Sequence, residues 1–377
     1  MPPSAPQQLL SRLAPLREVL ARIDALVHPV EPRDVELAAA AGRVLAADVL
    51  VEAPLPATAV ALRDGWAVRA EMVADAGPYA PAPLTPAPVF VEIGAPLPAD
   101  ADAVLPSDAV TLRGGVAEAT ATVAPGEGVL AAGADAEPGR PLCRAGTRLR
   151  AIDLALLRAA GVPRVAVRAP RLRLVTANAF VDAVDDTVAP LIARAIDGEG
   201  GAADIVRVAL DGALDRVLQE SEHADAIVVI GGTGAGRHDA SVRTLARLGQ
   251  VDIHGVGLTP GESAALGAIN GRAVLVLPGR LDAALAAWLV LGRHLLRRLT
   301  GRNDPDIGTP VQLARKIAST VGLAEVVLMR RGEGGVEPLA SGSFPLHVLA
   351  EADGWVLVAP DREGFPPGAT VDMYALP

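Results

Sequence analysis

Between residues 171 and 299, strand-like and helix-like segments alternate along the sequence. Apolar runs at residues 171–176 and 226–230 predict buried strands, because a strand covered on both faces carries few polar residues. The remaining predicted strands are residues 205–210, 251–256 and 273–277, and the predicted helices are residues 184–196, 211–222, 240–248 and 282–299. This alternation predicts a mostly parallel sheet with helices on both faces.

A glycine-rich segment, residues 231–239, lies at one of these strand-to-helix junctions. Glycines there allow backbone N–H groups to approach an anion at the start of the helix, where the helix dipole favours negative charge. The segment is not a Walker A loop, because Arg237 and His238 stand where that loop has Lys and Ser or Thr, and it lacks the last glycine of the Rossmann pattern. A tight turn with Asp239 as the helix cap is an equally good interpretation. The candidate ligand-binding residues of this loop are Gly231, Gly232, Thr233, Gly234, Gly236 and Arg237.

Two further glycine-containing loops, residues 259–262 and 278–280, follow other predicted strands of the same unit. Ligands of open α/β sheets bind outside the carboxyl ends of the strands, so we expect the three loops to converge. The additional candidate ligand-binding residues are Gly261, Pro278, Gly279 and Arg280. Two interpretations of Arg237 and Arg280 stay open, as phosphate contacts and as solvated surface residues.

The segments before residue 171 and after residue 302 have other patterns. Apolar residues spaced by three and four from Leu9 to Val27 predict an amphipathic helix that ends at Pro29. Two shorter helices are predicted at residues 36–45 and 152–160, the second ending at Gly161.

Short apolar runs with many Gly and Pro residues and no helical period predict an all-β segment at residues 49–141. Within it, the proline-rich residues 78–88 predict an extended loop that no central strand contains. The last part, residues 307–377, predicts a small β domain. The predicted fold is therefore α/β plus all-β, in four domains: an N-terminal helical and linker domain (8–50 and 142–170), a β-rich inserted domain (51–141), a central α/β domain (171–302) and a C-terminal β domain (303–377).

Composition excludes several classes of function. The 377 residues carry a formal net charge of −10 and only 2% aromatic residues, which argues against nucleic acid and against an anionic membrane surface as partners. No apolar stretch reaches the ~20 residues that cross a bilayer, and no signal-peptide pattern opens the sequence. Cys143 is the only cysteine, so we expect a buried thiol, no internal disulfide and a reduced, cytoplasmic setting.

Six segments carry a family resemblance in the same order along the chain. Residues 41–49, 64–69 and 94–104 are similar to the sequences GRVLAEDV, MDGYAVR and TGAPLPEGADAV, residues 146–149 with 161–162 to the approach to an α/β domain, and residues 231–239 and 278–279 to SGGVSVGDYD and PGNPVSA. Over nearly its whole length the chain thus resembles the molybdopterin molybdotransferase family, the group of MoeA and the gephyrin E domain.

The resemblance implies a fold, a reaction and a set of site residues. It implies a central molybdopterin-binding domain, a C-terminal β domain and an elongated homodimer. Members bind adenylylated molybdopterin, insert molybdate and release AMP with the help of acidic residues and a divalent cation. The implied ligands are molybdopterin as a pterin phosphate, molybdate and Mg2+, and the matched acidic positions, implied to be catalytic, are Asp64, Asp135 and Asp239.

This chain departs from the family at several acidic and basic positions. Ala59 and Asn178 stand where the family has carboxylates, and Glu262 stands in the loop where it has lysines. Leu130 and Ala134 replace an Arg and a Glu. The acidic residues after position 178 either replace the lost carboxylates or complement the start of the following helix; they are Asp182, Asp185 and Asp186.

Three functional hypotheses follow. The first is a divergent molybdotransferase, and the second is a non-catalytic carrier that holds molybdopterin or the finished cofactor and delivers it to a client molybdoenzyme. The third, an unrelated nucleotide-binding α/β protein, is disfavoured by the ordered matches outside the α/β unit.

Overall fold

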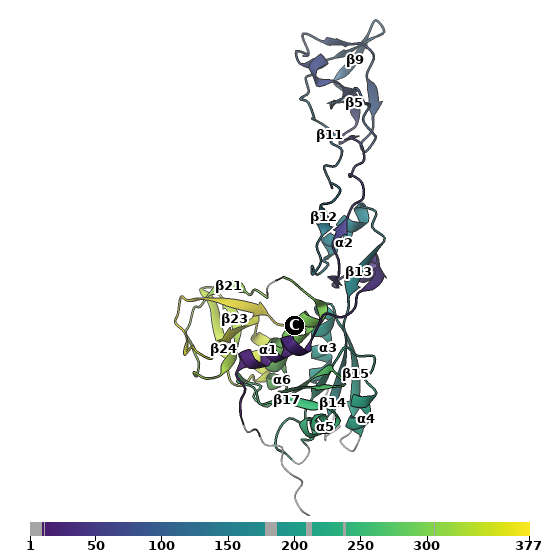
Figure 1. Ribbon diagram of the computed structural model, residues 1–377. Coiled ribbons are helices and arrows are strands. Elements are labelled where there is room, and N and C mark those ends of the chain that lie inside the picture. The colour runs from purple at the N-terminus through teal and green to yellow at the C-terminus, as the bar shows by residue number, and fades with distance from the viewer. Residues whose placement is uncertain (1–9, 11, 178–186, 209–212, 237–238, 305) are drawn as a thin grey trace, which may run out of the picture. The chain divides into compact units, whose positions relative to one another are not determined.

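The computed structural model describes residues 10, 12–177, 187–208, 213–236, 239–304 and 306–377. The chain divides into two compact units. Unit one comprises residues 1–47, 145–154 and 163–377, and unit two comprises residues 48–144 and 155–162. Figure 1 shows their helices and strands, coloured from the N-terminus to the C-terminus.

Unit one is built around a six-stranded sheet. Its strand order is β15 (Ala202–Val208), β14 (Arg171–Ala177), β16 (Ala226–Ile230), β20 (Arg272–Leu277), β19 (Ala265–Ile269) and β17 (Gln250–His254). The first four strands are parallel, and β19 and β17 pair antiparallel at one edge. The predicted mostly parallel sheet is confirmed, but β19 was not among the predicted strands.

Helices cover both faces of this sheet (Figure 1). Neighbouring strand residues point to opposite faces, so Val228 packs with one layer of helices and Val229 with the other. The first layer contains α1 (Leu16–Leu26), α3 (Val188–Gly198), α6 (Leu281–Ala287) and α7 (Arg293–Thr300), and the second contains α4 (Ala213–Gln219) and α5 (Ser241–Leu248).

The long helix predicted at residues 282–299 is interrupted. A π-helical segment, η4 (Trp288–Gly292), separates α6 from α7. Gly292 lies so close to the ring of Trp288 that a Cβ atom there would collide with it. The helix ends at Gly301, whose φ of +65° is the left-handed cap conformation.

Two predictions for the N-terminal segment are wrong. The first helix begins at Leu16 rather than at residue 9, because Pro15 directly precedes it and Ala14 forms a parallel bridge with Val256. The helix predicted at residues 36–45 is one 3-10 turn, η1 (Leu37–Ala40), between two strands. These strands, β1 (Arg33–Glu36) and β2 (Val44–Leu45), both pair with β13 (Arg164–Arg168).

Unit two is rich in short strands, as predicted. Two three-stranded sheets have the orders β6 (Ala82–Leu84), β10 (Val116–Ala119), β9 (Val110–Arg113) and β7 (Val89–Val91), β5 (Gly65–Val68), β8 (Ala103–Pro106). The remaining elements are η2 (Ala70–Val73) and the strands β3 (Val49–Leu50), β4 (Val60–Ala61), β11 (Val129–Leu130) and β12 (Pro141–Cys143), with Cys143 buried as expected. The proline-rich segment contains β6 rather than loop alone, and Pro83 is tolerated because β6 is an edge strand. The helix α2 (Ala151–Ala159) begins in unit one and continues in unit two.

The C-terminal β domain belongs to unit one. Its main sheet has the order β18 (Leu258–Thr259), β23 (Ala324–Gly332), β25 (Gly354–Val358), β27 (Thr370–Ala375) and β21 (Thr309–Gln312). A sixth strand of this sheet, β24 (Gly335–Ala340), pairs with β23. The other elements are β22 (Ile317–Ala318), α8 (Leu346–Glu351) and β26 (Gly364–Phe365). The four domain boundaries given above stay a prediction. None of the described helices has the length and hydropathy needed to span a membrane.

Candidate functional site

The glycine loop begins where β16 ends, at the carboxyl edge of the central sheet. Gly231 and Gly232 have φ angles of +98° and +71°, a region that favours glycine. The Ser241 hydroxyl, at the start of α5, donates a 2.7 Å hydrogen bond to the carbonyl oxygen of Gly231. A Cβ atom on Gly232 would collide with the Ser241 side chain. The glycines therefore allow the first turn of α5 to pack directly against the loop.

Asp239 closes the loop from within. One of its carboxylate oxygens accepts a 2.7 Å hydrogen bond from the Gly236 N–H group. Cβ atoms on Gly234 and Gly236 would lie 2.8 and 2.7 Å from the same oxygen. Asp239 is not the helix cap, because α5 begins at Ser241 after Ala240 and no side chain caps it. The cap interpretation is therefore wrong, and Arg237 lies outside the described residues.

Hydrogen bonds connect the glycine loop to its two neighbours. The Gly231 N–H group donates to the carbonyl oxygen of Leu277 at 2.9 Å, directly before Pro278. The buried Thr233 hydroxyl lies 2.8 Å from the hydroxyl of Ser263. His254 contacts the Thr233 carbonyl oxygen through Nε2 at 3.1 Å. The structure thus brings the three predicted loops together.

The loop at residues 259–262 differs from the prediction in its origin. It follows β18, which pairs with β23 of the C-terminal sheet instead of joining the central sheet. Gly261 has a φ of +128°, and a Cβ atom there would lie 3.4 Å from both the Ala283 carbonyl oxygen and the Ala287 side chain of α6. The half-buried Glu262 carboxylate accepts a 3.1 Å hydrogen bond from the Gly261 N–H group. The loop therefore carries a negative charge beside the other two loops.

Arg280 forms an ion pair with Asp282. Its Nη2 atom lies 2.8 Å from the Asp282 carboxylate, and its side chain is 77% exposed. Asp282 is buried and also accepts hydrogen bonds from the N–H groups of Ala283 at 2.9 Å and Phe344 at 3.3 Å. Burial raises the pKa of Asp282, but the bonds from Arg280, Ala283 and Phe344 outweigh burial and hold the pKa below its ordinary value. Sequence reasoning missed Asp282 and Phe344, although an acidic residue at a helix start is a recognisable signal.

A pocket of about 460 Å³ lies at the carboxyl ends of β14 and β15. This volume falls within the range that is usual for small-molecule sites. Its lining residues are Ala177, Val208, Leu214, Asp215, Ala240, Arg243, Thr244 and Arg247. Arg247 forms an ion pair with Asp215. Sequence reasoning missed Arg243 and Arg247, whose signal is a pair of cations four residues apart on the helix after the glycine loop.

The other two predicted acidic site residues belong to unit two. Asp64 is exposed, and its carboxylate accepts a 2.7 Å hydrogen bond from the Ile93 N–H group. Asp135 is also exposed, and its N–H group donates to the Leu55 carbonyl oxygen at 2.9 Å. Their participation in the site stays a prediction. Asn178, Asp182, Asp185 and Asp186 lie outside the described residues.

The side chains that the structure describes do not fit a cation held by the protein alone. Within the described ranges, no group of three or more His, Cys, Asp or Glu side chains is placed to hold a metal ion. Mg2+ binds in many proteins through one or two carboxylates together with substrate phosphates. Asp239 provides one such carboxylate at the loops, and it already accepts a hydrogen bond from the Gly236 N–H group.

Family models cover the chain in three consecutive segments. Residues 14–161 match the MoeA N-terminal region (domain I and II), residues 174–298 match the model described as "Probable molybdopterin binding domain", and residues 310–376 match the MoeA C-terminal region (domain IV). The chain belongs to the MoeA family. It is therefore a molybdenum cofactor biosynthesis protein with a molybdopterin-binding domain.

Relatives of the MoeA family cover most of the chain. Molybdopterin molybdenumtransferase 1 of Mycobacterium tuberculosis is 28% identical, over 96% of this chain and 98% of the relative. The molybdopterin molybdenumtransferase of Nostoc is 26% identical, over 71% and 69%. Two structures of the molybdopterin biosynthesis MoeA protein from Pyrococcus horikoshii each cover 97% of this chain and 100% of that chain, with TM-scores of 0.78 at 26% identity and 0.81 at 22% identity. The MoeA-like multidomain fold predicted from the sequence is confirmed.

Proposed function

We propose that the three carboxyl-edge loops bind molybdopterin through its phosphate, and that the chain inserts molybdate into adenylylated molybdopterin with release of AMP. The proposal rests on two hydrogen bonds that join the loops. The Gly231 N–H group donates to the Leu277 carbonyl oxygen, and the hydroxyls of Thr233 and Ser263 bond to each other. These two contacts join the loops at the carboxyl edge of the central sheet, where α/β sheets bind phosphorylated ligands. Relatives named molybdopterin molybdenumtransferase support the reaction.

A second candidate function is a carrier that holds molybdopterin or the finished cofactor for a client enzyme. The observation that favours it is Glu262, a half-buried negative charge at the loops. An anion such as molybdate is repelled by a carboxylate in a poorly solvated site. Asp239 adds a second carboxylate there. The two candidates share the ligand and differ in turnover.

One assay separates the two candidates. Purified protein is mixed with adenylylated molybdopterin, Mg2+ and molybdate, and both AMP release and protein-bound pterin are measured. AMP release that depends on molybdate supports the transferase. Bound pterin without AMP release supports the carrier, and absence of both contradicts pterin binding at this site.

A matched glycine pair tests the location. Gly236→Ala places a Cβ atom 2.7 Å from the Asp239 carboxylate, whereas Gly77→Ala in unit two has open space around it. We expect Gly236→Ala to weaken pterin binding by about fivefold, since the Asp239 carboxylate must move away and give up its hydrogen bond with the Gly236 N–H group, which loosens the loop. Gly77→Ala leaves binding unchanged. Equal affinities of the two variants would contradict the proposed location.

The proposal includes the homodimer that the resemblance implies and, for the carrier candidate, a client molybdoenzyme. In a homodimer, Asp64 and Asp135 of the partner subunit would complete the site. Sedimentation equilibrium tests the dimer, and pull-down of a purified molybdoenzyme with the pterin-loaded protein tests the client.

A further inference from the structure

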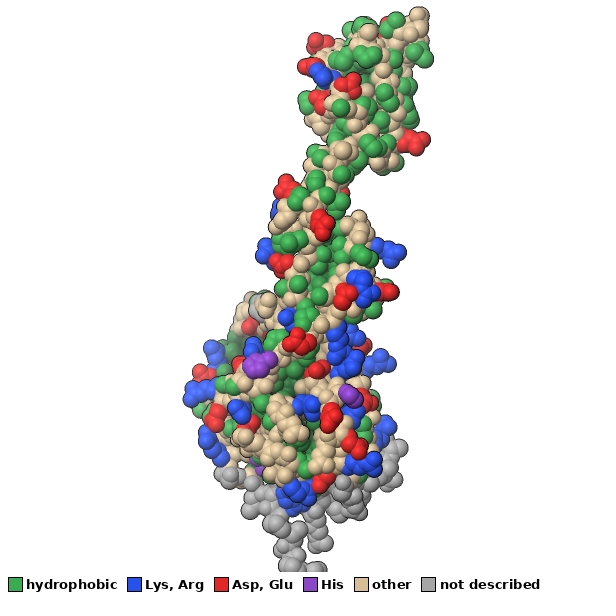
Figure 2. Space-filling view, turned by 45° about the vertical axis from the view of Figure 1, so that its right-hand side comes forward, with side chains coloured by type: hydrophobic (Ala, Val, Ile, Leu, Met, Phe, Trp, Pro, Cys, Tyr) green, Lys and Arg blue, Asp and Glu red, His purple; other side chains and the backbone are tan. Residues whose placement is uncertain are grey.

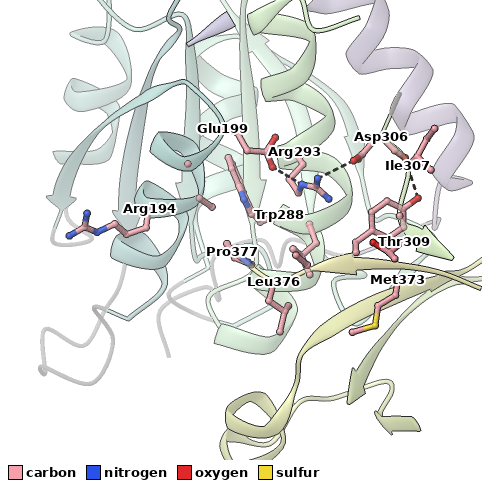
Figure 3. A pocket seen from close by; sticks show the side chains of 16 residues that line it. Arg194, Glu199, Trp288, Arg293, Asp306, Ile307, Thr309, Met373, Leu376 and Pro377 are labelled. Carbon is pink, nitrogen blue, oxygen red and sulfur yellow. Dashed lines mark hydrogen bonds and ion pairs between the residues drawn. The ribbon is translucent and has the colours of Figure 1, made fainter. Parts of the chain in front are cut away.

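A second pocket lies away from the three loops, between the α/β part and the C-terminal sheet of unit one (Figure 3). Its volume is about 410 Å³. Glu199 follows the end of α3 just before β15 begins, so this wall lies at the amino edge of the parallel strands. The glycine loop follows the carboxyl end of β16 and therefore lies at the opposite edge. The pocket is thus separate from the proposed molybdopterin site.

Aromatic side chains concentrate at this pocket. The whole chain has three Trp and two Tyr residues. Trp288 and Tyr374 line the pocket, and Trp355 stacks on Tyr374 with ring centroids 4.7 Å apart. All the Trp and Tyr residues of unit one therefore meet here. Figure 3 shows Trp288 of η4 and Arg293 of α7 on one side, with Met373 of β27 and Leu376 just after β27 on the other. Flat aromatic walls with aliphatic neighbours suit a flat apolar ligand body.

A fixed cation lies in the wall of the pocket. Arg293 is held by Glu199 through Nε at 2.7 Å and by Asp306 through Nη2 at 3.1 Å. Its guanidinium also lies 6.0 Å from the ring centroids of Trp355 and Tyr374. The side chain is 17% exposed, so part of it is reachable from the pocket. These contacts orient the guanidinium before any ligand enters.

Two donors in the pocket wall lack acceptors. The indole Nε1 of Trp288, a residue that is 1% exposed, and the Nη1 atom of Arg293 are buried without a hydrogen-bond partner among the described residues. Buried donors are satisfied in most structures, so such exceptions indicate a missing acceptor. The Glu199 and Asp306 carboxylates do not supply it, since both already pair with other nitrogens of Arg293, and Glu199 also pairs with Arg302.

An exposed cation stands at the edge of the pocket. Arg194 on α3 lines the pocket, and its guanidinium extends toward solvent (Figure 3). It has no ion-pair partner in the part of the chain that the structure describes. Rotation about its side-chain bonds brings the charge over the pocket, where it adds a long-range attraction for an anion.

We propose that this pocket binds a small organic carboxylate with a flat, apolar body. The ring packs between Trp288, Tyr374 and the aliphatic residues Leu289 and Met373. Neither donor atom is exposed in the free protein, so the pocket wall opens slightly on binding, and the carboxylate oxygens then accept hydrogen bonds from Trp288 Nε1 and Arg293 Nη1. The charge of Arg194 strengthens the binding.

Phenylacetate is a suitable probe, with phenylacetamide as the neutral control and acetate as the control without a ring. The full-length protein is labelled with 15N, and its three Trp residues give three indole signals, of which Trp288→Phe identifies one. We expect millimolar phenylacetate to shift the Trp288 signal and both controls to shift it much less. No shift with phenylacetate, or equal shifts with phenylacetamide, would overturn the proposal.

Two charge variants give a second test that does not depend on the pocket's fold. Arg194→Gln and Arg17→Gln remove the same charge from exposed helical positions of unit one, and Arg17 lies on α1 outside the pocket. We expect Arg194→Gln to weaken phenylacetate binding by about threefold to fivefold and Arg17→Gln to leave it unchanged. Trp288→Phe keeps a ring but removes the donor, and we expect about fivefold to tenfold weaker binding. Unchanged affinity in both Arg194→Gln and Trp288→Phe would contradict the site.

Discussion

The two compact units differ most clearly in charge. Residues 48–144, the main part of unit two, carry five arginines, no lysine and thirteen acidic residues. Most of the chain's formal net charge of −10 therefore lies there. Figure 2 agrees with this on the face it shows, where Lys and Arg side chains gather over the α/β and C-terminal parts. Unit one therefore balances its acidic residues with arginines, whereas unit two carries an excess of negative charge at its surface.

The hydrophobic cores of the two units differ in the size of their buried side chains. The central sheet and its helices bury long aliphatic side chains such as Leu275 and Ile192. The main core of unit two consists mostly of Ala and Val, and its two buried leucines are Leu84 and Leu105. A small-residue core buries less apolar area per residue, and hydrophobic stabilisation scales with that area. Unit two should therefore be the more easily unfolded part.

Matched core truncations produce the largest expected effect. Leu105 and Leu275 are both fully buried, and replacement of either by Ala costs about 2–5 kcal/mol. The same loss lowers Tm roughly twice as much in a domain of about 100 residues as in one of about 200. We expect Leu105→Ala to lower the transition of unit two more than Leu275→Ala lowers that of unit one. Calorimetry of both variants checks this, and a single transition that shifts equally in both would show that the units unfold together.

Alanine substitutions at two glycines with positive φ should have the next largest effect on the free energy of unfolding. Gly232, in the glycine loop, has a φ of +71° and no room for a Cβ atom, whereas Gly115 in unit two has a φ of +84° and open space. An alanine in this conformation costs about 1–2 kcal/mol, and a collision with Ser241 adds to that cost only at Gly232. We expect about 3 kcal/mol for Gly232→Ala and about 1 kcal/mol for Gly115→Ala in the free energy of unfolding. Denaturant titration measures both, and equal losses would mean that the loop relaxes without strain.

Charge removal tests whether local or net charge governs anion binding. Glu262→Gln and Glu92→Gln each remove one negative charge, the first at the three loops and the second from an exposed position in unit two. Exposed charges act weakly beyond ~10 Å at 0.1 M ionic strength, whereas a half-buried carboxylate is screened less. We expect Glu262→Gln to tighten binding of inorganic pyrophosphate by about fivefold and Glu92→Gln to leave it unchanged. Isothermal titration at two salt concentrations measures this, and an equal gain in both variants would assign the effect to net charge.

The sequence predicted the parts of the fold that local patterns encode. The run from Ala226 to Ile230 is apolar at every position, which identifies a strand covered on both faces. Glycines after strands identified the three loops. By contrast, β1 has the sequence RDVE and pairs with β13 about 130 residues later, so neither apolar periodicity nor closeness in sequence predicts this strand.

At the candidate site, too, features that depend on local sequence were easier to predict than long-range contacts. Gly231 and Gly232 were identifiable because their φ angles exclude most other residues. Of the two interpretations of Asp239, the helix cap is wrong, because a cap assignment depends on whether α5 begins one residue earlier or later, and its role in the site stays a prediction. The contact between Asp282 and Phe344 joins residues 62 positions apart, and only the packed C-terminal part creates it. Local conformation was therefore predictable at the site, and its tertiary contacts were not.

The smallest expected effect is on the pH dependence of stability, and it concerns two carboxylates whose pKa values are both lowered. Burial raises the pKa of Asp282 but hydrogen bonds from Arg280 and the backbone outweigh it, and in unit two the Ala124 N–H group and Arg63 lower the pKa of the exposed Glu127. A lowered folded-state pKa contributes stability above the unfolded-state pKa, near 3.8 for Asp282, and this stability is lost as the pH falls through the folded-state value. We therefore expect Asp282→Asn to destabilise unit one at pH 7 and to match the unchanged protein at low pH, where both side chains are neutral.

Glu127→Gln is the control for this pH dependence. Its carboxylate is exposed, and solvent screens its contacts with Arg63, so the variant should unfold like the unchanged protein at every pH. Thermal unfolding of both variants between pH 3 and pH 7 measures the difference from the unchanged chain, which cancels the titration of all other carboxyls. If the Asp282→Asn difference stays constant with pH, the side chain acts through packing beside Phe344 and not through its charge. If it disappears at low pH, the ion pair with Arg280 stabilises the contact between the site loops and the C-terminal part.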